Sequence, residues 1–225
     1  MPPVSAAVIA GGASSRMGRP KGLLEIDGAP LITRVTDVLS RLSDDLICVT
    51  CRPQEYAFAA ARLRMVPDFG GVPQGPLSGI LAALEASRND LCVVVAVDMP
   101  FLNAELLRYL ARLATGYDVV LPIVESDRPE CLHAVYRKSC LPHGKAALES
   151  GLRRVAGFFP DVAVRRVHRF RLRRYDSELT SFENVNTPRE LTHVLEKSPI
   201  AGSRLPGGSP PAESAAGAIK CHEAW

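Results

Sequence analysis

The sequence lacks a strong excess of charge of either sign. Its 27 Lys and Arg residues are nearly balanced by 24 Asp and Glu residues, so the formal net charge is only +3. Nucleic-acid-binding and membrane-surface proteins usually carry a larger basic surplus, and this balance argues against both classes. We therefore expect no nucleic acid and no membrane among the partners.

Long hydrophobic runs are also missing. No apolar stretch reaches the roughly 18–20 residues that a membrane-spanning helix needs. The opening stretch, MPPVSAAVIAGG, has no basic residue before its apolar part, so we expect no secretory signal peptide. The six cysteines are scattered, mostly within apolar segments, and do not form a disulfide pattern. Reduced, buried thiols of this kind are typical of the cytoplasm, where we expect the protein to reside.

What is present is an ordinary globular composition. Hydrophobic residues make up 47% of the sequence and charged residues 23%, and the chain is long enough to bury a full core. Residues 198–225 are rich in Pro, Gly, Ser and Ala, which predicts a disordered tail. We expect one domain over residues 1–197, followed by that tail.

Apolar runs alternate with amphipathic segments through the first half of the chain. Continuous hydrophobicity marks strands that are covered on both faces, and apolar residues repeating on one face mark helices. Strands are predicted at Val4–Ala10, Leu46–Cys51, Leu63–Val66 and Leu91–Val97, and helices at Pro30–Leu42, Glu55–Ala61, Leu77–Ser87 and Asn103–Leu113. This order predicts an α/β fold, a three-layer sandwich with a mostly parallel central sheet.

The second half of the chain is less regular. Strands are predicted at Val119–Ile123 and Leu132–Tyr136, a helix at Lys138–Ser150, and a strand or hairpin at Val162–Tyr175. A capping box with Pro at the first helical position predicts a last helix over Thr187–Lys197.

The first predicted strand runs into a loop rich in glycine and basic residues, GGASSRMGRPK. Glycines let backbone N–H groups approach phosphate oxygens, while Arg16 and Lys21 supply positive charge. The loop follows a strand end, where open α/β sheets bind ligands. It suits a triphosphate, although a surface turn with solvated bases would have the same composition. Neither a P-loop nor a G-x-G-x-x-G motif is present, which disfavours a dinucleotide oxidoreductase.

Asp98 directly follows the most apolar predicted strand, LCVVVAV. It should therefore lie at the carboxyl edge of the sheet, next to the first loop if the two strands are neighbours. A carboxylate there can hold Mg²⁺, which typically takes one or two protein carboxylates plus substrate phosphates. The alternative is an Asp that only caps the turn before Pro100.

Four ordered blocks resemble the molybdenum cofactor guanylyltransferase family: AGGASSRMGRPKGLLEIDGAPLI, GPLSGI, VDMPFL and ENVNTPREL. The resemblance spans about residues 4–197 and implies a fold like that of the nucleotide-diphospho-sugar transferases. It also implies transfer of GMP from GTP to Mo-molybdopterin with Mg²⁺, which yields the guanine dinucleotide cofactor and pyrophosphate. A molybdoenzyme or its chaperone would be a further partner.

The resemblance assigns roles to individual residues. Those that it implies bind the nucleotide are Ile9, Ala10, Gly11, Gly12, Lys21, Asp68, Gly75, Pro76, Leu77 and Asp98. Asp98 would also be the metal ligand. Arg16, Lys21 and Asp98 would carry catalysis by neutralising phosphate charge, because a phosphate monoester with a second pKa of about 6 needs no general base. Asn184 and Asn186 would lie near the acceptor or the metal.

Two positions depart from the guanylyl pattern. Pro20 stands where that family usually has Asp, and at this position the chain resembles the related cytidylyltransferases more closely. Val49 stands where the guanylyl family often has Asn. A molybdopterin cytidylyltransferase or a sugar-phosphate nucleotidylyltransferase on the same fold therefore stays open. A non-catalytic nucleotide-binding regulatory module is a third hypothesis, although binding alone would not need the carboxylate of Asp98.

Several cysteine and histidine residues could be ligands but are predicted to pack. Cys48 and Cys51 have the spacing of a zinc half-site, but no second pair follows, so we expect core thiols. Cys131 and His133 alternate along one predicted strand, where packing residues are more common than ligands.

Two arginine-rich segments have open roles. Six arginines lie between Arg165 and Arg174, and the apolar residues among them predict an exposed strand with a solvated face. One hypothesis is that Arg169 and Arg171 grip the anionic acceptor. The adjacent Arg153 and Arg154 would either serve the site or oppose a helix dipole.

Overall fold

The computed structural model describes residues 1–11, 20–125, 128–185 and 190. The predictions made for Gly12, Arg16 and Asn186, for the helix after Thr187 and for the tail over residues 198–225 fall outside these ranges. Within them, no helix is both long enough and apolar enough to cross a lipid bilayer.

A central sheet carries the fold, with the strand order β10-β7-β9-β6-β1-β4-β5 and a short β8 beside β7. Its strands are β1 (Val4–Ile9), β4 (Leu46–Val49), β5 (Arg64–Val66), β6 (Leu91–Ala96), β7 (Val119–Glu125), β8 (Arg128–Pro129), β9 (His133–Arg137) and β10 (Val164–His168). β9 is antiparallel to both of its neighbours and β8 is antiparallel to β7, whereas the other pairs are parallel. The prediction of a mostly parallel sheet is confirmed.

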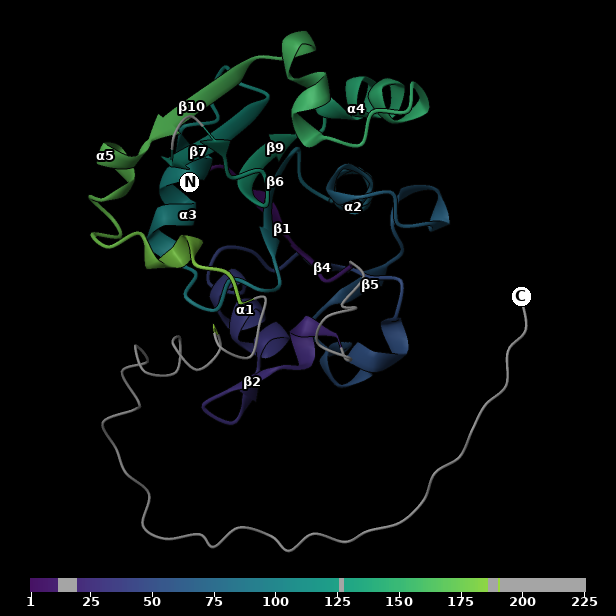
Figure 1. The fold of residues 1–225 in the computed structure, drawn as a ribbon, viewed down its shortest axis with the longest axis vertical. Helices are drawn as coiled ribbons and strands as arrows, with labels where there is room; N and C mark the ends of the chain where they lie inside the picture. Colours follow the sequence, from purple (N-terminus) through teal and green to yellow (C-terminus); the bar gives the residue numbers. More distant parts are fainter. Residues whose placement is uncertain (12–19, 126–127, 186–189, 191–225) are drawn as a thin grey trace, which may run out of the picture.

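Helices cover both faces of the sheet and make three layers (Figure 1). One face carries α1 (Leu31–Leu39) and α3 (Ala104–Arg112), and the other carries α2 (Pro76–Ala86) and α4 (Cys140–Glu149). In β1, Ala6 and Val8 pack in the core beneath α1 and α3. Ala7 and Ile9 point to the opposite core. Because both faces of the strand are buried, its hydrophobicity is continuous.

Short elements fill the connections. They are the β2–β3 hairpin (Glu25–Ile26 and Ala29–Pro30), the 3₁₀ turns η1 (Lys21–Leu23), η2 (Pro53–Ala59), η3 (Phe69–Gly71), η4 (Val155–Asp161) and η5 (Thr180–Phe182), and the single-turn helix α5 (Arg169–Leu172). The helix predicted near Glu55 is therefore a 3₁₀ helix. The predicted N-cap of α3 is confirmed, because the Asn103 side chain accepts hydrogen bonds from two backbone N–H groups of the first turn.

The strand or hairpin predicted over Val162–Tyr175 is wrong beyond His168. β10 ends there and the chain turns into α5. Phe170 is 66% exposed whereas Leu172 is fully buried. Residues two apart in a strand would share one face, but in a helix they point to nearly opposite sides, so helical geometry buries Leu172 without burying the charged residues around it.

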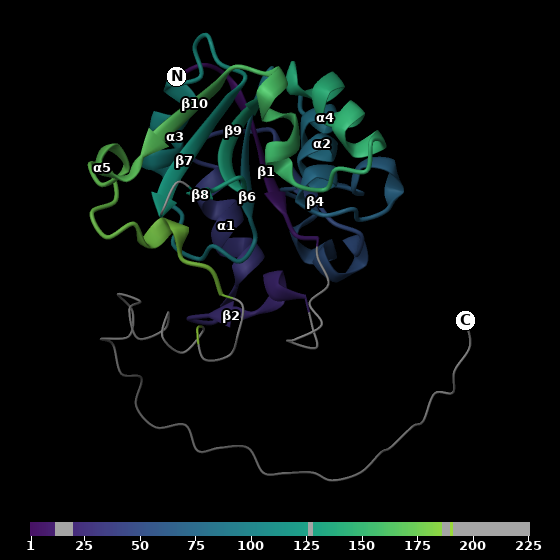
Figure 2. The same cartoon turned by 45° about the horizontal axis from the view of Figure 1, so that its top comes forward.

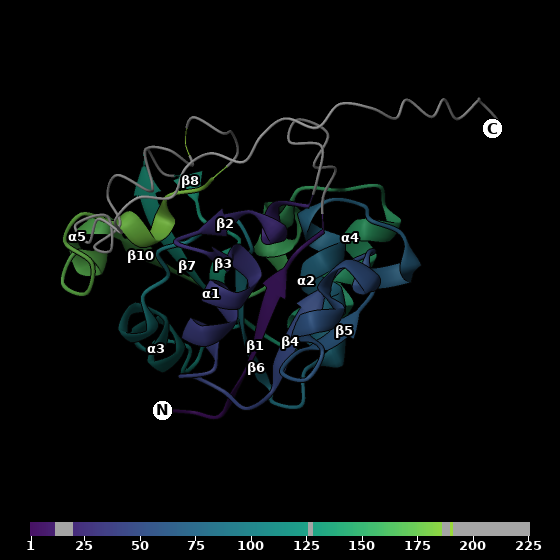
Figure 3. The ribbon, with the colours of Figure 1, turned by 90° about the horizontal axis from the view of Figure 1, so that it is seen from below.

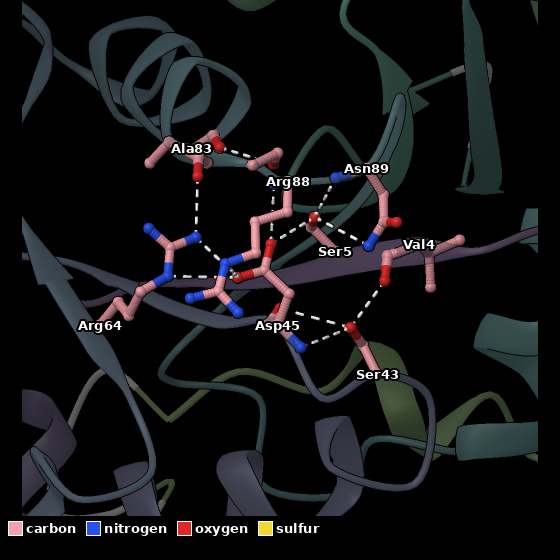
Figure 4. A network of polar contacts seen from close by, with 10 residues as sticks. Val4, Ser5, Ser43, Asp45, Arg64, Ala83, Arg88 and Asn89 are labelled. Atoms are coloured by element: carbon pink, nitrogen blue, oxygen red, sulfur yellow. Dashed lines mark hydrogen bonds and ion pairs between the residues drawn. The ribbon is translucent and has the colours of Figure 1, made fainter.

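A buried carboxylate ties the amino edge of the sheet together (Figure 4). Asp45 accepts hydrogen bonds from Ser5 Oγ at 2.6 Å, from the Arg88 backbone N–H at 2.9 Å and from Arg64 Nη2 at 2.6 Å. Burial opposes ionisation, but these hydrogen bonds outweigh it and hold the pKa of the Asp45 carboxyl below its usual value. The network joins β1, β4, β5 and the end of α2 at the edge opposite the ligand-binding end.

Candidate functional site

The carboxyl ends of β1 and β6 meet at one edge of the sheet. The two strands are parallel neighbours, with Ile9 paired to Ala96, so they deliver Gly11 and Asp98 to the same place. Figure 3 shows the β2–β3 hairpin and β8 at the end of the sheet toward which the arrow of β1 points. A cleft of about 850 Å³ opens there.

Lys21 and Asp98 form an ion pair in this cleft. Lys21 Nζ donates to Asp98 Oδ2 at 2.7 Å, and the two side chains are 27% and 17% exposed. Gly11 and Lys21, at the two ends of the glycine-and-base loop, and the carboxylate after LCVVVAV therefore lie in one cleft, as their positions in the sequence predicted. This half-buried pair offers both signs of charge: the ammonium of Lys21 suits phosphate oxygens, and the carboxylate of Asp98 suits a metal ion bound to them.

Gly22 lets the Lys21 segment lie close against the sheet. A Cβ atom at this position would lie 2.8 Å from the Tyr56 ring and 3.0 Å from a methyl group of Val97, which are distances that packed atoms do not tolerate. The missing side chain allows η1 to settle on the end of β6, and the neighbouring Lys21 thereby reaches Asp98.

Most of the predicted site residues that the structure describes line the cleft. They are Ile9, Ala10, Gly11, Lys21, Pro76, Asp98 and Asn184. Gly75 is the N-cap of α2 and has a φ of 91°, a left-handed conformation that favours glycine. Leu77 is fully buried in the core between α2 and the sheet, so its side chain does not face the cleft.

Asp68 lies beside Gly11 and is only 5% exposed. Its Oδ1 accepts a hydrogen bond from Ser78 Oγ at 2.9 Å, whereas its Oδ2 has no hydrogen-bond partner among the described residues. A Cβ atom on Gly11 would lie 3.3 Å from that oxygen, so the absence of a side chain lets Gly11 and Asp68 lie close together. A buried carboxylate oxygen without a donor is costly, and a ligand N–H group would relieve the cost.

Of the opposite wall of the cleft, the sequence had suggested only Arg154, as one of two open hypotheses. Arg128, Glu130 and Arg154 line it as well. The first two precede β9, and an antiparallel strand brings its beginning to the edge where parallel strands end. Recognising that direction would have identified them. Burial, helped by the negative charge of Glu125 and opposed by Arg128, raises the pKa of the Glu130 carboxyl.

The arginine pair after α4 divides into two roles. Arg153 Nη1 donates to the backbone C=O of Leu148 at 2.9 Å, so Arg153 satisfies the end of α4. No hydrogen bond or ion pair of Arg154 occurs within the described part of the chain, and its exposed side chain lies on the cleft wall.

The arginines between Arg165 and Arg174 do not line the cleft. Arg165 lies over the Tyr117 ring at 5.3 Å, and Arg171 lies over Phe170 at 5.8 Å. The hypothesis that Arg169 and Arg171 grip the acceptor directly is therefore not supported, because α5 turns these side chains to the outer surface.

The cysteines among the described residues are all free thiols. Cys48 is buried as predicted, but Cys51 is exposed, because β4 ends at Val49 and Cys51 lies in the loop beyond it. Cys131 is half-buried on the cleft wall. His133 is fully buried with its ring 4.3 Å from that of Phe182, which confirms it as a packing residue.

The donor set fits a metal ion that is held mainly by its substrate. No group of three or more His, Cys, Asp or Glu side chains gathers at one point in the described segments. Of the two carboxylates that line the cleft, Asp98 lies at the end of β6 and accepts from Lys21 through Oδ2, whereas Glu130 lies on the opposite wall. Mg²⁺ suits such a site, since it commonly takes one or two carboxylates and completes its shell with phosphates and water.

Comparisons with known proteins give one consistent family. Residues 6–164 match the model of the MobA-like NTP transferase domain. The chain is 39% identical over 186 residues to a probable molybdenum cofactor guanylyltransferase of Pelotomaculum thermopropionicum, covering 82% of this chain and 88% of that one. A protein of the same name from Methanosarcina mazei is 36% identical, with 85% and 89% covered.

Solved structures agree on the fold. The molybdopterin-guanine dinucleotide biosynthesis protein A of Archaeoglobus fulgidus superposes with a TM-score of 0.74 at 30% identity, covering 85% of this chain and 97% of that one. A 4-diphosphocytidyl-2C-methyl-D-erythritol synthase of Anaerococcus prevotii has a TM-score of 0.64 at 16% identity, with 87% and 95% covered, and shares the fold. The nucleotide-diphospho-sugar-transferase-like architecture expected from the sequence is confirmed.

Proposed function

The chain belongs to the MobA-like NTP transferase family, and from that premise we propose that it transfers GMP from GTP to Mo-molybdopterin, forming the molybdopterin guanine dinucleotide and pyrophosphate. Relatives named guanylyltransferases, 30–39% identical over more than four fifths of the chain, support this activity. The observation that carries it is the Lys21–Asp98 pair in the cleft, with the buried Asp68 next to the lining residue Gly11.

The reaction is a substitution at the α-phosphorus of GTP. An oxygen of the acceptor's phosphate monoester attacks that phosphorus, the bond to the oxygen that bridges to the β-phosphorus breaks, and pyrophosphate leaves with the electron pair. The attacking monoester is ionised near neutral pH because its second pKa is about 6. No general base is needed, so the protein contributes alignment and charge neutralisation.

The residues around the ion pair divide this work. The backbone at Ala10 and Gly11 and the ammonium of Lys21 would hold the triphosphate. Asp98 would hold Mg²⁺, and Lys21 donates to the same carboxylate. When bound, Mg²⁺ neutralises negative charge on the phosphates. The half-buried setting strengthens these interactions relative to water.

Asp68 supports guanine as the base. The Watson–Crick edge of guanine presents two adjacent donors, N1–H and N2–H, whereas that of cytosine presents one amino group. Asp68 Oδ2, a buried oxygen without a donor among the described residues, is suited to such an edge. The other carboxylate oxygen, Oδ1, already accepts from Ser78 Oγ. Val49, which departs from the guanylyl pattern, is fully buried, so its side chain does not bear on base choice in this conformation.

The opposite wall is suited to the anionic acceptor. Arg128 and Arg154 place guanidinium groups on the cleft, and the guanidinium fork matches phosphate geometry. Asn184 adds an amide group between the two walls. We propose that the protein works in the cytoplasm, where the free thiols are stable, and that a molybdoenzyme or its chaperone receives the product.

Measurement of pyrophosphate release tests the activity. We expect release from GTP, dependent on both Mo-molybdopterin and Mg²⁺, with little release from CTP. Asp98→Ala should lower kcat by about 10²–10³-fold, because one charged group that acts on the transition state contributes on that order. Asp37→Ala is the matched control, since Asp37 pairs only with Arg62 on the surface at 2.6 Å.

Each alternative has its own outcome in this assay. Release with CTP alone would select the cytidylyltransferase, and GTP binding without release would select the regulatory module. Full activity of a folded Asp98→Ala variant would reject the proposed site even if the wild-type enzyme were active.

A further inference from the structure

The segment that leads into the ENVNTPREL motif crosses the carboxyl edge of the sheet. We call residues Tyr175–Val185 the strap. In Figure 2 it runs from the α5 side of the molecule toward the β2–β3 hairpin. Its start is fixed on α3, where Asn103 Nδ2 donates to the Tyr175 C=O at 2.8 Å and the rings of Tyr109 and Tyr175 stack at 4.5 Å.

Asp176 draws the middle of the strap into a compact hydrogen-bonded loop. Its Oδ1 accepts from the Thr180 backbone N–H at 3.2 Å and from Thr180 Oγ1 at 3.3 Å. Its Oδ2 accepts from the Ser181 backbone N–H at 2.8 Å and from Ser181 Oγ at 2.6 Å. The next residue, Phe182, lies on the buried ring of His133. One carboxylate thus sets the path of a segment that has almost no regular secondary structure.

The far end of the strap contacts Asp98 and the residues that follow Lys21. The Val185 backbone N–H donates to the C=O of Asp98 at 2.8 Å. Its side chain is fully buried in a small cluster with Leu24 and Ile26, which lie just beyond Lys21. Asn184, one residue earlier, lines the cleft. Val185 therefore joins the segment from Lys21 to Ile26 to the turn that carries Asp98.

We infer that Asp176 and Val185 are positioning residues for the nucleotidyl transfer. The inference rests on the proposed function and deepens it. The strap fixes the segment from Lys21 to Ile26 relative to Asp98 and holds Asn184 in the cleft, so Asp176 and Val185 act through other groups and themselves touch no substrate. A displacement of about 1 Å in such a constellation can cost about 10²-fold in rate, which makes the strap a determinant of kcat.

The test separates alignment from substrate binding. Asp176→Ala and Val185→Ala should each lower kcat at least about 10-fold. The Kd of a fluorescent GTP analogue should change less than about threefold, because Gly11 follows β1, Asp68 follows β5 and Pro76 begins α2, so none of them lies on the strap. Asp176→Asn keeps one acceptor oxygen, so its kcat should lie between those of Asp176→Ala and the wild type.

Asp118→Ala is the matched control. Asp118 also joins distant segments, accepting from Ser139 Oγ and from the Ala163 backbone N–H at 2.9 Å, but it lies at the amino edge beside the start of β7. It should lower the melting temperature and leave kcat close to the wild-type value. Equal kcat in Asp176→Ala and wild type, or equal losses in Asp176→Ala and Asp118→Ala, would overturn the inference.

Amide hydrogen exchange provides a readout that does not need turnover. Asp176→Ala should speed exchange at Val185, whose N–H bonds to Asp98, whereas Asp118→Ala should not. If the wild-type enzyme releases no pyrophosphate, the proposed function fails, and the strap is judged on this exchange alone. Unchanged protection of the Val185 amide in Asp176→Ala would then reject the positioning role of the strap. If Asp176→Ala does not fold, Asp176→Asn carries both measurements.

Discussion

Asp68 and Asp98 are carboxylates at the same edge of the sheet, but their surroundings differ. Asp98 is half-buried and faces the ammonium of Lys21, so it is suited to cations. Asp68 is buried, accepts a hydrogen bond from the Ser78 hydroxyl, and has one carboxylate oxygen without a donor among the described residues, so it is suited to neutral N–H donors. Under the proposed function, two residues of one type would thus take different parts in binding one nucleotide, because their neighbours differ.

The unpaired oxygen of Asp68 leads to a prediction about base selection. Asp68→Asn replaces an acceptor-only group with an amide of nearly the same shape. We expect kcat/KM for GTP to fall about 10- to 100-fold, since a hydrogen bond to a charged group is worth about 1.5–3 kcal/mol. Steady-state kinetics with GTP and CTP would measure it. Equal losses with both nucleotides would contradict a role in reading the base.

At the scale of elements, the turn from α4 to η4 separates two arginines that the sequence could not tell apart. Both arginines line the cleft, but Arg153 donates to the C=O of Leu148 near the end of α4, whereas Arg154 has no hydrogen bond or ion pair among the described residues. The direction of the chain at the end of the helix therefore decides which guanidinium the helix already engages and which is left for a ligand.

This separation predicts different effects for the two arginines. Arg154→Ala should raise the KM for Mo-molybdopterin about 10-fold and leave the KM for GTP nearly unchanged, because a charge-assisted contact to phosphate would be lost. Arg153→Ala should instead lower the free energy of unfolding by about 0.5–1 kcal/mol through loss of the helix end contact. Kinetics with each substrate and urea unfolding distinguish them.

The Arg169→Ala/Arg171→Ala double variant, on the outer surface of α5, is the control and should change neither KM. A rise in the KM for Mo-molybdopterin in this control alone would support direct contact of Arg169 and Arg171 with the acceptor, which the structure argues against. A rise in both KM values for Arg154→Ala would place that residue on the nucleotide instead.

At the scale of the whole molecule, His133 lies fully buried within the sheet and links fold stability to pH. Burial lowers the pKa of its imidazole from 6.5 to about 4, although the negative charge of Asp176 acts in the opposite direction. Between these two pH values the unfolded chain binds a proton that the folded protein does not. The free energy of unfolding therefore falls as the pH drops from 6.5 to 4.

The expected loss from this histidine approaches roughly 3 kcal/mol at pH 4, at about 1.4 kcal/mol for each pH unit. Urea unfolding between pH 7 and about pH 4 would measure it. His133→Leu, similar in volume and without a titrating group, should flatten the decline, whereas the exposed His168→Gln should not. A decline just as steep in His133→Leu would assign the effect to other groups, such as Asp45 at lower pH.

The sequence by itself determined the layers, the buried strands, and the positions of Gly11, Lys21 and Asp98 at strand ends. Those features depend on local hydrophobic periodicity and on the chemistry of short motifs, which can be read along the chain. Within the described residues, only the tertiary structure decided the antiparallel direction of β9, which adds Arg128 and Glu130 to the cleft, and the path of the strap to Val185. A strand buried on both faces has the same apolar pattern in either direction, so long-range packing fixes its orientation and, with it, the far wall of the site.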